Sequence, residues 1–330
     1  MATTVTPVRK IAVTTPLKKL ARRRRGRPVH GILLLDKPSG GSSNHALQRA
    51  KRLFDAQKAG HTGSLDPLAT GMLPVCFGEA TKLSAFLLDA DKGYETTLQL
   101  GVTTNSADAD GEVLETRDVP TDLTEEQFKL VCNQFKGPLQ QVPPMVSAIK
   151  IDGQRLYKLA REGKEVERPA RSITIHDLQV LSFSGSTARL AVKCSKGTYI
   201  RSLVTDIGEA IGCGAHVTAL RRTFVSPFER LEMLTMEHLE SRFTADFKSL
   251  DELLLPLDAG LSHLAAVSIS EEGLATFRRG QSPFCVPIAK ADSSAQGVCR
   301  VYDEHGVMVG LGELSETGEQ VAPRRVLQFT

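Results

Sequence analysis

The chain has 330 residues, of which 41% are hydrophobic and 24% charged, a globular composition that excludes wholesale disorder. This length predicts two folded domains rather than one small module. Forty-one basic residues oppose 38 acidic ones, and no apolar run reaches the ~18 residues of a membrane helix, so no membrane association is expected. The six cysteines are scattered without a C-x-x-C pair, and no secretory signal is evident. We therefore predict neither a zinc site nor a disulfide framework, and a cytoplasmic location.

The N-terminal segment differs in charge from the rest of the chain. Residues 1–28 contain nine basic side chains and no acidic one, so the remaining residues carry a net charge of −6. An acid-free, arginine-rich segment can condense on a phosphate backbone, which makes nucleic acid the first partner to consider. A solvated tail has the same composition, and an organellar transit peptide is a third, weaker interpretation. We predict a flexible tail over residues 1–28.

The first half of the chain gives three clear local signals. The apolar stretch Gly31–Leu35 predicts a buried strand that ends at a turn rich in proline and glycine. Ser42 begins a segment with N-cap chemistry, and apolar residues then follow at helical spacing up to Phe54. Further on, apolar and polar side chains alternate between Tyr94 and Val102, which predicts a half-buried strand opened by Tyr94.

The second half predicts two more helices and a change of fold type. Thr124 begins a capping box, and the helix that follows is expected to end at Gly137. A strand over residues 188–194 precedes a helix over residues 200–211, which places Tyr199 and Arg201 in the first turn after a strand. From about residue 256 the chain changes to short strands and tight turns. Because strands and helices mix without a regular βαβ rhythm, we predict an α+β fold.

The densest concentration of turn residues surrounds one carboxylate. Asp66 lies within His61–Gly71, a segment with a glycine on each side of it and a proline directly after it. Considered alone, an Asp-Pro pair most often starts a turn by bonding its own backbone. The phosphate-loop pattern G-x-x-x-x-G-K is absent, and the eight histidines have no metal-ligand spacing. No metal site is therefore predicted.

Long motifs in a fixed order resemble a known family. They are Gly31-Ile-Leu-Leu-Leu-Asp-Lys-Pro38, Gly60-His-Thr-Gly-Ser-Leu-Asp-Pro-Leu-Ala-Thr-Gly-Met-Leu-Pro74, Gly78-Glu-Ala-Thr-Lys82, Lys92-Gly-Tyr94, Ala107-Asp-Ala-Asp-Gly111, Val142-Pro-Pro-Met-Val-Ser-Ala-Ile-Lys150, Ser195-Lys-Gly-Thr-Tyr-Ile-Arg201, Gly214-Ala-His-Val217, Leu220-Arg-Arg222 and Val321-Ala-Pro-Arg-Arg325. This sequence resembles the TruB family of bacterial tRNA pseudouridine synthases, which isomerise the T-loop uridine at tRNA position 55. The resemblance covers most of the chain.

The resemblance implies a role for each of five residues. Asp66 matches the catalytic nucleophile, as suits covalent catalysis by a carboxylate, and whether it attacks C1′ or the uracil ring stays open. Arg201 matches the arginine that pairs with this aspartate, from which we expect a lowered pKa of Asp66. Tyr94 matches the tyrosine that stacks on the target base and is a candidate for removing the C5 proton. Tyr199 and Leu220 match two further residues of the base pocket.

Further residues are implicated in RNA binding by the same resemblance. A uridine inside a folded loop is reached only after it is extruded, and His61 matches the family's flipping histidine. Lys82 and Asp108 are expected to be further substrate contacts. Phosphate contact and a solvated surface charge are equally compatible with four other cations, which are Lys150, Arg155, Arg221 and Arg222.

The resemblance also implies the domain organisation. We expect a mixed central sheet of the pseudouridine-synthase type over residues 29–255, with an inserted RNA-gripping segment at about 120–160. Residues 256–330 are expected to form a small barrel-like RNA-binding domain of the PUA type; their net charge is −3, so RNA binding must rely on local basic faces. Isomerisation is redox-neutral and needs no group donor, so no cofactor is expected. The implied partner is tRNA, bound by a monomer without guide RNA.

Three other functions compete with this interpretation. The first is an RNA-binding or tRNA-folding protein on the same scaffold with little or no catalysis, against which the complete set of Asp66, Tyr94 and Arg201 argues. The second is an enzyme of free nucleosides or glycosides, which usually needs a second carboxylate that does not stand out here. The third is a guide-RNA-dependent relative, disfavoured by the continuous insertion and the lack of a long C-terminal extension.

Overall fold

The computed structural model describes residues 26–147, 149–151, 153–164, 166–243, 246–289 and 297–329. The predicted basic tail therefore lies outside the described residues except for residues 26–28. The elements of the larger domain are β1 (Gly31–Lys37), α1 (Ser43–Leu53), β2 (Ala59–His61), β3 (Thr70–Phe77), η1 (Gly78–Lys82), α2 (Ser84–Asp89), β4 (Lys92–Leu100), β5 (Val102–Thr104), β6 (Val113–Thr116), α3 (Glu125–Asn133), β7 (Gly137–Gln141), β8 (Lys150–Ile151), β9 (Gln154–Arg155), α4 (Leu156–Arg161), β10 (Arg171–Ser184), β11 (Thr187–Cys194), α5 (Ile200–Ile211), β12 (Ala215–Val225), α6 (Met236–Arg242) and α7 (Lys248–Asp251).

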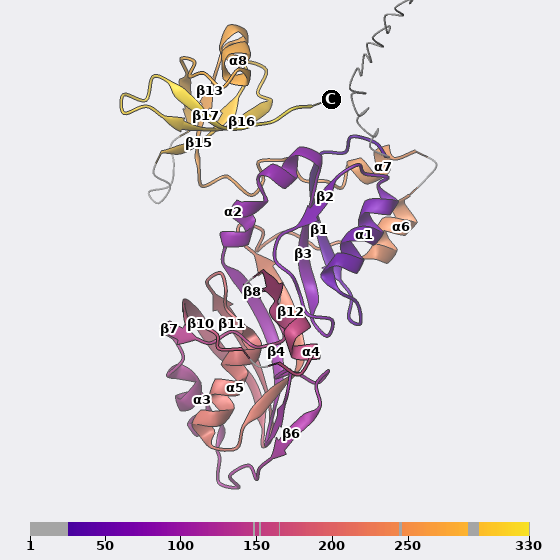
Figure 1. Ribbon diagram of the computed structural model, residues 1–330, viewed down its shortest axis with the longest axis vertical. Helices are drawn as coiled ribbons and strands as arrows, with labels where there is room; N and C mark the ends of the chain where they lie inside the picture. The colour runs from indigo at the N-terminus through magenta and orange to yellow at the C-terminus, as the bar shows by residue number, and fades with distance from the viewer. Residues whose placement is uncertain are drawn as a thin grey trace, which may run out of the picture.

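An eight-stranded mixed sheet forms the centre of this domain (Figure 1). Its strands follow the order β1-β3-β12-β4-β11-β10-β7, and β2 pairs with β3 beside this path. All of these pairs are antiparallel except β3 with β12, which meet in parallel through Arg221 and Arg222. The predicted α+β class is confirmed, because helices and mostly antiparallel strands share one sheet.

The two larger of the three hydrophobic cores along this sheet pack helices onto its two ends. One forms between α5, α3 and strands β4, β10, β11 and β12, and it includes Leu98, Leu190 and Leu203. The other packs α1 and α6 onto β1 and β3. Burial along β4 alternates from Thr96 to Leu100, as the period of two predicts. The sheet is therefore held at both ends, and the strands at its middle are fixed in register.

Most local predictions are confirmed. The Oγ of Ser42 accepts a hydrogen bond from the backbone N–H of His45 at the start of α1, and the capping box of Thr124 is complete. Gly212 ends α5 in the left-handed conformation at φ +95°. The predicted end of α3 at Gly137 is wrong, because the helix ends at Asn133 and tight turns follow; Gly137, at φ +96°, instead begins β7.

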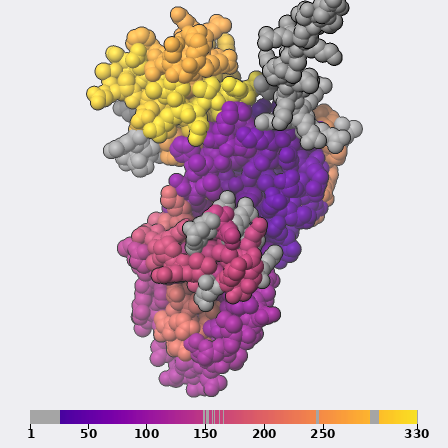
Figure 2. All heavy atoms as spheres, in the orientation of Figure 1, coloured from indigo at the N-terminus to yellow at the C-terminus, as the bar shows by residue number. Residues whose placement is uncertain are grey.

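The expected insertion at about 120–160 is only partly a separate segment. The side chain of Phe128 on α3 is fully buried in the core beside β10 and α5. Strand β7 pairs with β10 from Gly137 to Gln141 and extends the sheet. The β8–β9 hairpin pairs with no strand of the central sheet, and α4 follows this hairpin directly. Figure 2 shows this part of the chain on the surface. A helix that supplies a core side chain and a strand that pairs along its length belong to the scaffold.

The C-terminal part is a small β-rich domain. It contains β13 (Ala265–Ser268), α8 (Glu271–Arg278), β14 (Val286–Ala289), β15 (Val298–Tyr302), β16 (Met308–Leu314) and β17 (Val321–Val326). Its sheet order is β14-β13-β15-β16-β17, and an isolated antiparallel bridge between Phe284 and Gln320 brings the starts of the two outer strands together, so the sheet is barrel-like without a continuous closing ladder over residues 265–289 and 297–329. The predicted hairpin over residues 301–311 is confirmed by the antiparallel pair β15–β16.

The two domains share a packed and hydrogen-bonded boundary (Figure 1). Leu83, before α2, packs with Leu264, Met308 and Leu327 in one cluster. The hydroxyl of Tyr302 donates a 2.5 Å hydrogen bond to the carboxylate of Asp258, which leads into the C-terminal domain. None of the helices that the structure describes is long and apolar enough to cross a membrane.

Candidate active site

The loop between β2 and β3 presents Asp66 and is held from two sides. The Oγ of Ser43, in the first turn of α1, accepts a 2.7 Å hydrogen bond from the N–H of Leu65 and lies 3.0 Å from its carbonyl oxygen. The buried ammonium of Lys37, at the end of β1, donates to the carbonyl oxygen of Ala69 at 2.7 Å. The turn that the Asp-Pro pair predicts is also present, because the N–H of Ala69 donates to the carbonyl of Asp66. The loop that carries the carboxylate is thus fixed by α1, by β1 and by its own turn.

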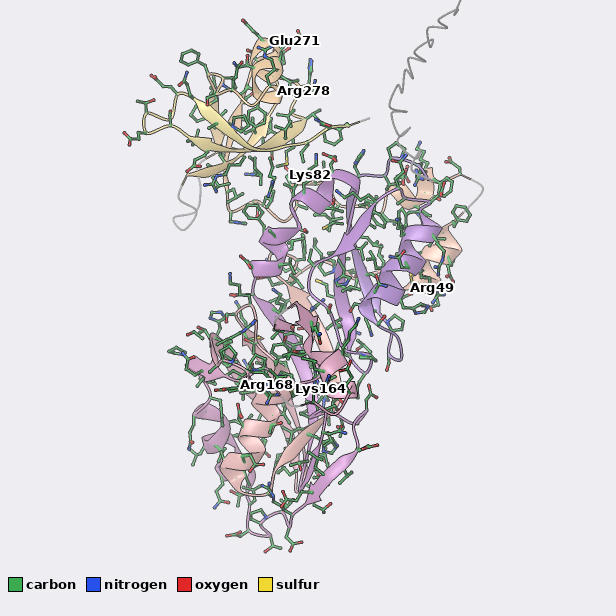
Figure 3. The ribbon with its side chains drawn as sticks, in the orientation of Figure 1. Arg49, Lys82, Lys164, Arg168, Glu271 and Arg278 are labelled. Atoms are coloured by element: carbon green, nitrogen blue, oxygen red, sulfur yellow. The ribbon has the colours of Figure 1, made fainter. Side chains whose placement is uncertain are left out.

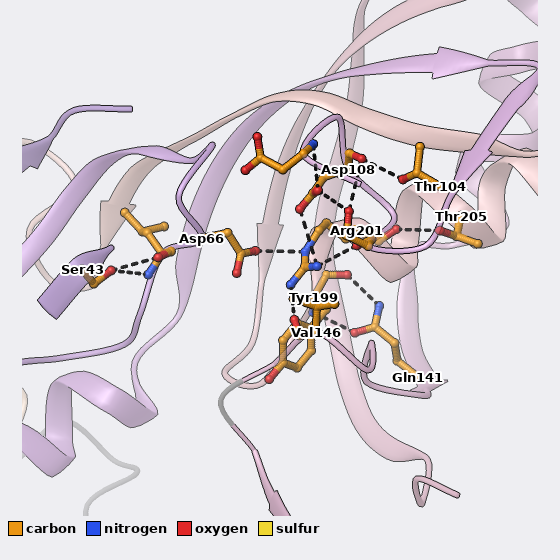
Figure 4. Close-up of polar contacts among 12 residues, drawn as sticks. Ser43, Asp66, Thr104, Asp108, Gln141, Val146, Tyr199, Arg201 and Thr205 are labelled. Carbon is orange, nitrogen blue, oxygen red and sulfur yellow. Dashed lines mark hydrogen bonds and ion pairs between the residues drawn. The ribbon is translucent and has the colours of Figure 1, made fainter. Parts of the chain in front are cut away.

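Arg201 is the centre of the polar network in Figure 4. Its Nε lies 2.9 Å from the carboxylate of Asp66, and its Nη1 lies 3.5 Å from that of Asp108. The remaining donors reach the carbonyl oxygens of Ser106 and Val146, each at 2.7 Å. The arginine side chain is only 2% exposed, whereas that of Asp66 is 36% exposed. The guanidinium is therefore fully satisfied inside the protein, and the carboxylate faces the cavity.

The expected lowering of the pKa of Asp66 is wrong. Burial raises the pKa of this carboxyl above its ordinary value, and the negative charge of Asp108 raises it further. Arg201 and Lys37 lower the pKa but do not overcome burial, because Arg201 is shared between two carboxylates. The sequence identifies the ion pair but does not show how far the site is removed from water.

The predicted pocket residues come together around one cavity. A cavity of about 290 Å³ is lined by Asp66, Tyr94, Tyr199, Leu220 and Arg201, as the resemblance implies. Its size lies near the small end of the ~300–1,000 Å³ typical of ligand pockets. Two aromatic rings and an apolar side chain beside one carboxylate suit a flat, polar-edged ligand such as a single base. The tyrosines come from separate elements, β4 and the N-cap of α5.

Both pocket tyrosines are partly buried. Burial raises the pKa of Tyr94 and of Tyr199 above the ordinary value for a phenol. The backbone of Tyr199 is fixed by Gln141, whose side chain accepts a 2.7 Å hydrogen bond from its N–H and donates to its carbonyl at 3.1 Å. Gln141 lies at the end of β7, so the edge strand helps to position the pocket wall.

Three predicted substrate contacts do not line this cavity. Lys82 forms a 2.5 Å ion pair with Glu79 and donates to the carbonyl of Val326, so it joins the two domains instead (Figure 3). Asp108 is 4% exposed and acts as the second partner of Arg201. His61 ends β2, shortly before the loop residues that line the cavity, and burial lowers its pKa. A neutral ring next to the loop that lines the cavity is compatible with the predicted role of His61 in base flipping.

Several residues of the site were not assigned a role from the sequence. Lys37 supports the Asp66 loop, and Lys92 donates to the carbonyls of Leu88 and Ala90 at 2.7 and 2.5 Å. Burial lowers the pKa of both ammonium groups to about 8. Arg222, considered as a phosphate contact or a surface charge, is 1% exposed and lines the cavity. All three lie in motifs that the resemblance rests on, but burial of a cation is not visible in a motif.

The other cations considered for phosphate contact differ in their surroundings. Arg221 forms a 2.7 Å ion pair with Asp36 on the neighbouring part of the sheet. The side chains of Lys150 and Arg155 lie outside the described part of the structure. Within the described ranges, no group of three or more His, Cys, Asp or Glu side chains is arranged to hold a metal ion.

Solved structures resemble this fold over most of its length. A Cbf5-Nop10-Gar1 complex matches with a TM-score of 0.69 and 25% identity over 91% of this chain and 84% of that chain. A structure of an H/ACA RNP bound to a substrate RNA containing 2'-deoxyuridine matches with a TM-score of 0.70 and 24% identity, over 94% and 92% of the two chains. The second likeness shows the fold alone.

Sequence relatives and family models identify the class. The tRNA pseudouridine synthase B of Stutzerimonas stutzeri (strain A1501) is 53% identical over 92% of this chain and 97% of its own, and that of Pseudomonas aeruginosa (strain UCBPP-PA14) is 51% identical over the same shares. The TruB family pseudouridylate synthase (N terminal domain) model matches residues 51–200. The tRNA pseudouridylate synthase B C-terminal domain matches 201–262, and the Pseudouridine synthase II TruB, C-terminal model matches 265–327. The fold and the sequence relatives define a pseudouridylate synthase. The chain belongs to the TruB family.

Proposed function

We propose that this protein isomerises uridine to pseudouridine at position 55 in the T-loop of tRNA, with Asp66 as nucleophile. One observation carries the proposal: the Asp66 carboxylate, paired at 2.9 Å with a buried Arg201, faces a cavity lined by Tyr94, Tyr199 and Leu220. A paired but partly exposed carboxylate beside a base-sized cavity is what covalent catalysis on a nucleoside requires. Identity of 51–53% to curated tRNA pseudouridine synthases B supports tRNA as the substrate.

The cavity accepts a base only after the base has left its stack. Asp66 and Tyr94 lie on its walls, so a uridine within a folded loop must swing out to reach them. In this proposal His61, two residues before the cavity-lining Gly63, occupies the vacated position. The carboxylate then bonds to C1′ or to the uracil ring, and the C1′–N1 bond breaks. After the base turns, C1′ bonds to C5, and Tyr94 is placed to remove the C5 proton.

The proton and electron balance of this reaction needs no further reagent. Overall one C–N bond is exchanged for one C–C bond, C5 loses a proton and N1 gains one, so nothing is oxidised or reduced. If Asp66 is bonded to C1′, it is released unchanged when C1′ bonds to C5; if it is bonded to the uracil ring, it is released by elimination as the C5 proton is lost. The side chains that line the cavity therefore supply the nucleophile, the base and the walls.

We also propose that the protein works alone on tRNA, as a cytoplasmic monomer without guide RNA. The chain matches 97% of the length of tRNA pseudouridine synthases B, so it spans nearly all of those relatives. All six cysteines are free thiols and five are buried, which suits a reducing compartment. The β8–β9 hairpin and α4 follow Ser147, which lines the cavity, and are placed to touch the bound RNA beside it.

The test uses unmodified tRNA transcript and two proteins, the wild type and Asp66→Asn. Pseudouridine is mapped by carbodiimide-dependent stops of reverse transcriptase, and binding is measured in parallel by filter retention. We expect a stop at position 55 with wild type only and comparable binding by both. Binding without any stop would support the RNA-binding alternative, and a stop with Asp66→Asn would overturn the assignment of the nucleophile. A transcript with cytidine at position 55 is the substrate control.

A further inference from the structure

Arg222 is a buried cation whose charge no carboxylate balances. It is 1% exposed, and among the residues that the structure describes no Asp or Glu forms an ion pair with it. Its Nε donates to the carbonyl of Met72 at 2.6 Å, and its Nη2 donates to that of Gly63 at 3.1 Å. A charge taken out of water without a counter-ion is costly. A purely structural contact to two carbonyls would not require a charged group.

The strand register brings Arg222 to Tyr94. The two residues are direct partners in the antiparallel pair of β12 with β4, and both line the cavity. Side chains of direct register partners project from the same face of a sheet, so the guanidinium and the phenol ring are neighbours there. Two carbonyls fix its Nε and Nη2, while Nη1 donates to no carbonyl or carboxylate among the described residues. The group is thus locked in place beside the Tyr94 ring.

We propose that Arg222 is a positioning residue for proton removal from C5: it holds the phenolic oxygen of Tyr94 and stabilises the phenolate. This inference rests on the proposed function, in which Tyr94 takes the C5 proton. A phenol must lose its own proton before it accepts another. When the C1′–N1 bond breaks, N1 keeps the electron pair and takes the phenol proton; the phenolate then removes the C5 proton and is a phenol again, so no external acid or base is consumed. A neighbouring fixed cation favours the anion, which burial alone disfavours.

The electrostatics of the surrounding groups agree with this geometry. Burial raises the pKa of Tyr94, whereas the charge of Arg222 and its hydrogen bond act to lower it. The same charge lowers the pKa of His61 and of Lys92. Arg222 therefore makes its end of the cavity favourable for an anion and unfavourable for a second cation. Arg201 likewise favours the anionic form of the nucleophile, the Asp66 carboxylate with which it pairs.

The test compares wild type, Arg222→Gln, Arg222→Lys and the control Arg189→Gln. Arg189 is a surface residue of β11 that pairs with Glu95 at 3.2 Å and does not line the cavity. Single-turnover rates are measured on transcripts whose target uridine carries hydrogen or deuterium at C5. We expect Arg222→Gln to be slower by about 10²-fold. Its deuterium isotope effect should exceed that of wild type, because proton removal becomes limiting, and Arg222→Lys should recover part of both.

The isotope effect separates this role from a structural one. It is a ratio of two rates in the same protein, so it is unaffected by the fraction of the variant that folds. A slow Arg222→Gln with the wild-type isotope effect would overturn the proposal and leave Arg222 as a support for Met72 and Gly63. A further check uses 5-fluorouridine, which has no C5 proton: covalent capture by Asp66 should be as fast in Arg222→Gln as in wild type. A wild type without pseudouridine formation would instead refute the proposed function itself.

Discussion

Replacing Arg201 with methionine tests whether the polar network of the site stabilises the fold as well as the nucleophile. The wild-type guanidinium satisfies two carboxylates at 2.9 and 3.5 Å and two carbonyls at 2.7 Å, all from a side chain that is 2% exposed. Methionine has a similar length but no donor. Removing one partner of a buried pair costs ~3–5 kcal/mol, because the remaining charge is left uncompensated. We expect Arg201→Met to lose about that much free energy of unfolding at neutral pH.

This loss should depend on pH in a defined direction. Without Arg201, which lowers the pKa of Asp66 against the effect of burial, that pKa rises further in the folded state, so the folded protein binds more protons than the unfolded chain. Stability then falls as pH rises, and the deficit against wild type should be larger at pH 7 than at pH 5. Adding Asp108→Asn removes one of the two unpaired charges and should restore part of the stability at pH 7 without restoring activity.

The measurement is urea unfolding followed by far-ultraviolet circular dichroism, since the chain contains no tryptophan. Wild type, Arg201→Met and the double variant are compared at pH 5 and pH 7. The surface variant Arg189→Gln is the control, because exposed ion pairs contribute only ~0–1 kcal/mol. If Arg201→Met loses no more than this control, the reasoning about the buried network is wrong.

Three further predictions concern the nucleophile and the frame. Because the pKa of Asp66 is raised, the single-turnover rate should decline on acidification at a higher pH than a free aspartate would give, and Asp108→Asn should move that decline to lower pH. Gly71→Ala should unfold at clearly lower urea than wild type, since its Cβ would lie 2.2 Å from a backbone oxygen of β12 at φ +99°; Gly137→Ala, at φ +96° with open space around it, should lose much less. Thr124→Ala, which removes the capping box of α3, should cost ~1 kcal/mol in the same assay.

The sequence predicts those parts of the site that depend on local signals. Alternation along β4 places Tyr94 on a strand, and the helical period that ends at Gly212 places Arg201 in the first turn of α5. The turn chemistry around Asp66 identifies a fixed loop. Each of these signals acts within about ten residues, so it survives in a single sequence without an alignment. These local signals do not show that the residues meet at one cavity; only the family resemblance predicts that.

The remaining features depend on contacts between distant segments. Lys82 is the last residue of one of the family motifs, which predicts a substrate contact. In the structure its ammonium donates instead to the carbonyl of Val326 in the other domain. The pKa of Asp66 shifts in the direction opposite to the one expected, because burial outweighs the effect of Arg201, which lies 135 positions away along the chain. Phe128 shows the same limit in the insertion, where a local helix signal does not reveal that the helix packs into the core. Strand pairing and burial decide these points.

Local charge, not bulk charge, explains how this chain can receive RNA. Outside the basic tail the chain carries a net charge of −6, which alone would repel a polyanion. The cavity is nevertheless lined by the cations Lys92, Arg171, Arg201 and Arg222 against the single carboxylate Asp66. The two arginines that flank the chemistry stand on α5 and β12, which only three residues separate. One short stretch of chain thus contacts both the nucleophile and the base. Its replacement should slow both the breakage of the C1′–N1 bond and the removal of the C5 proton. Exchange of surface charges elsewhere should alter RNA affinity alone.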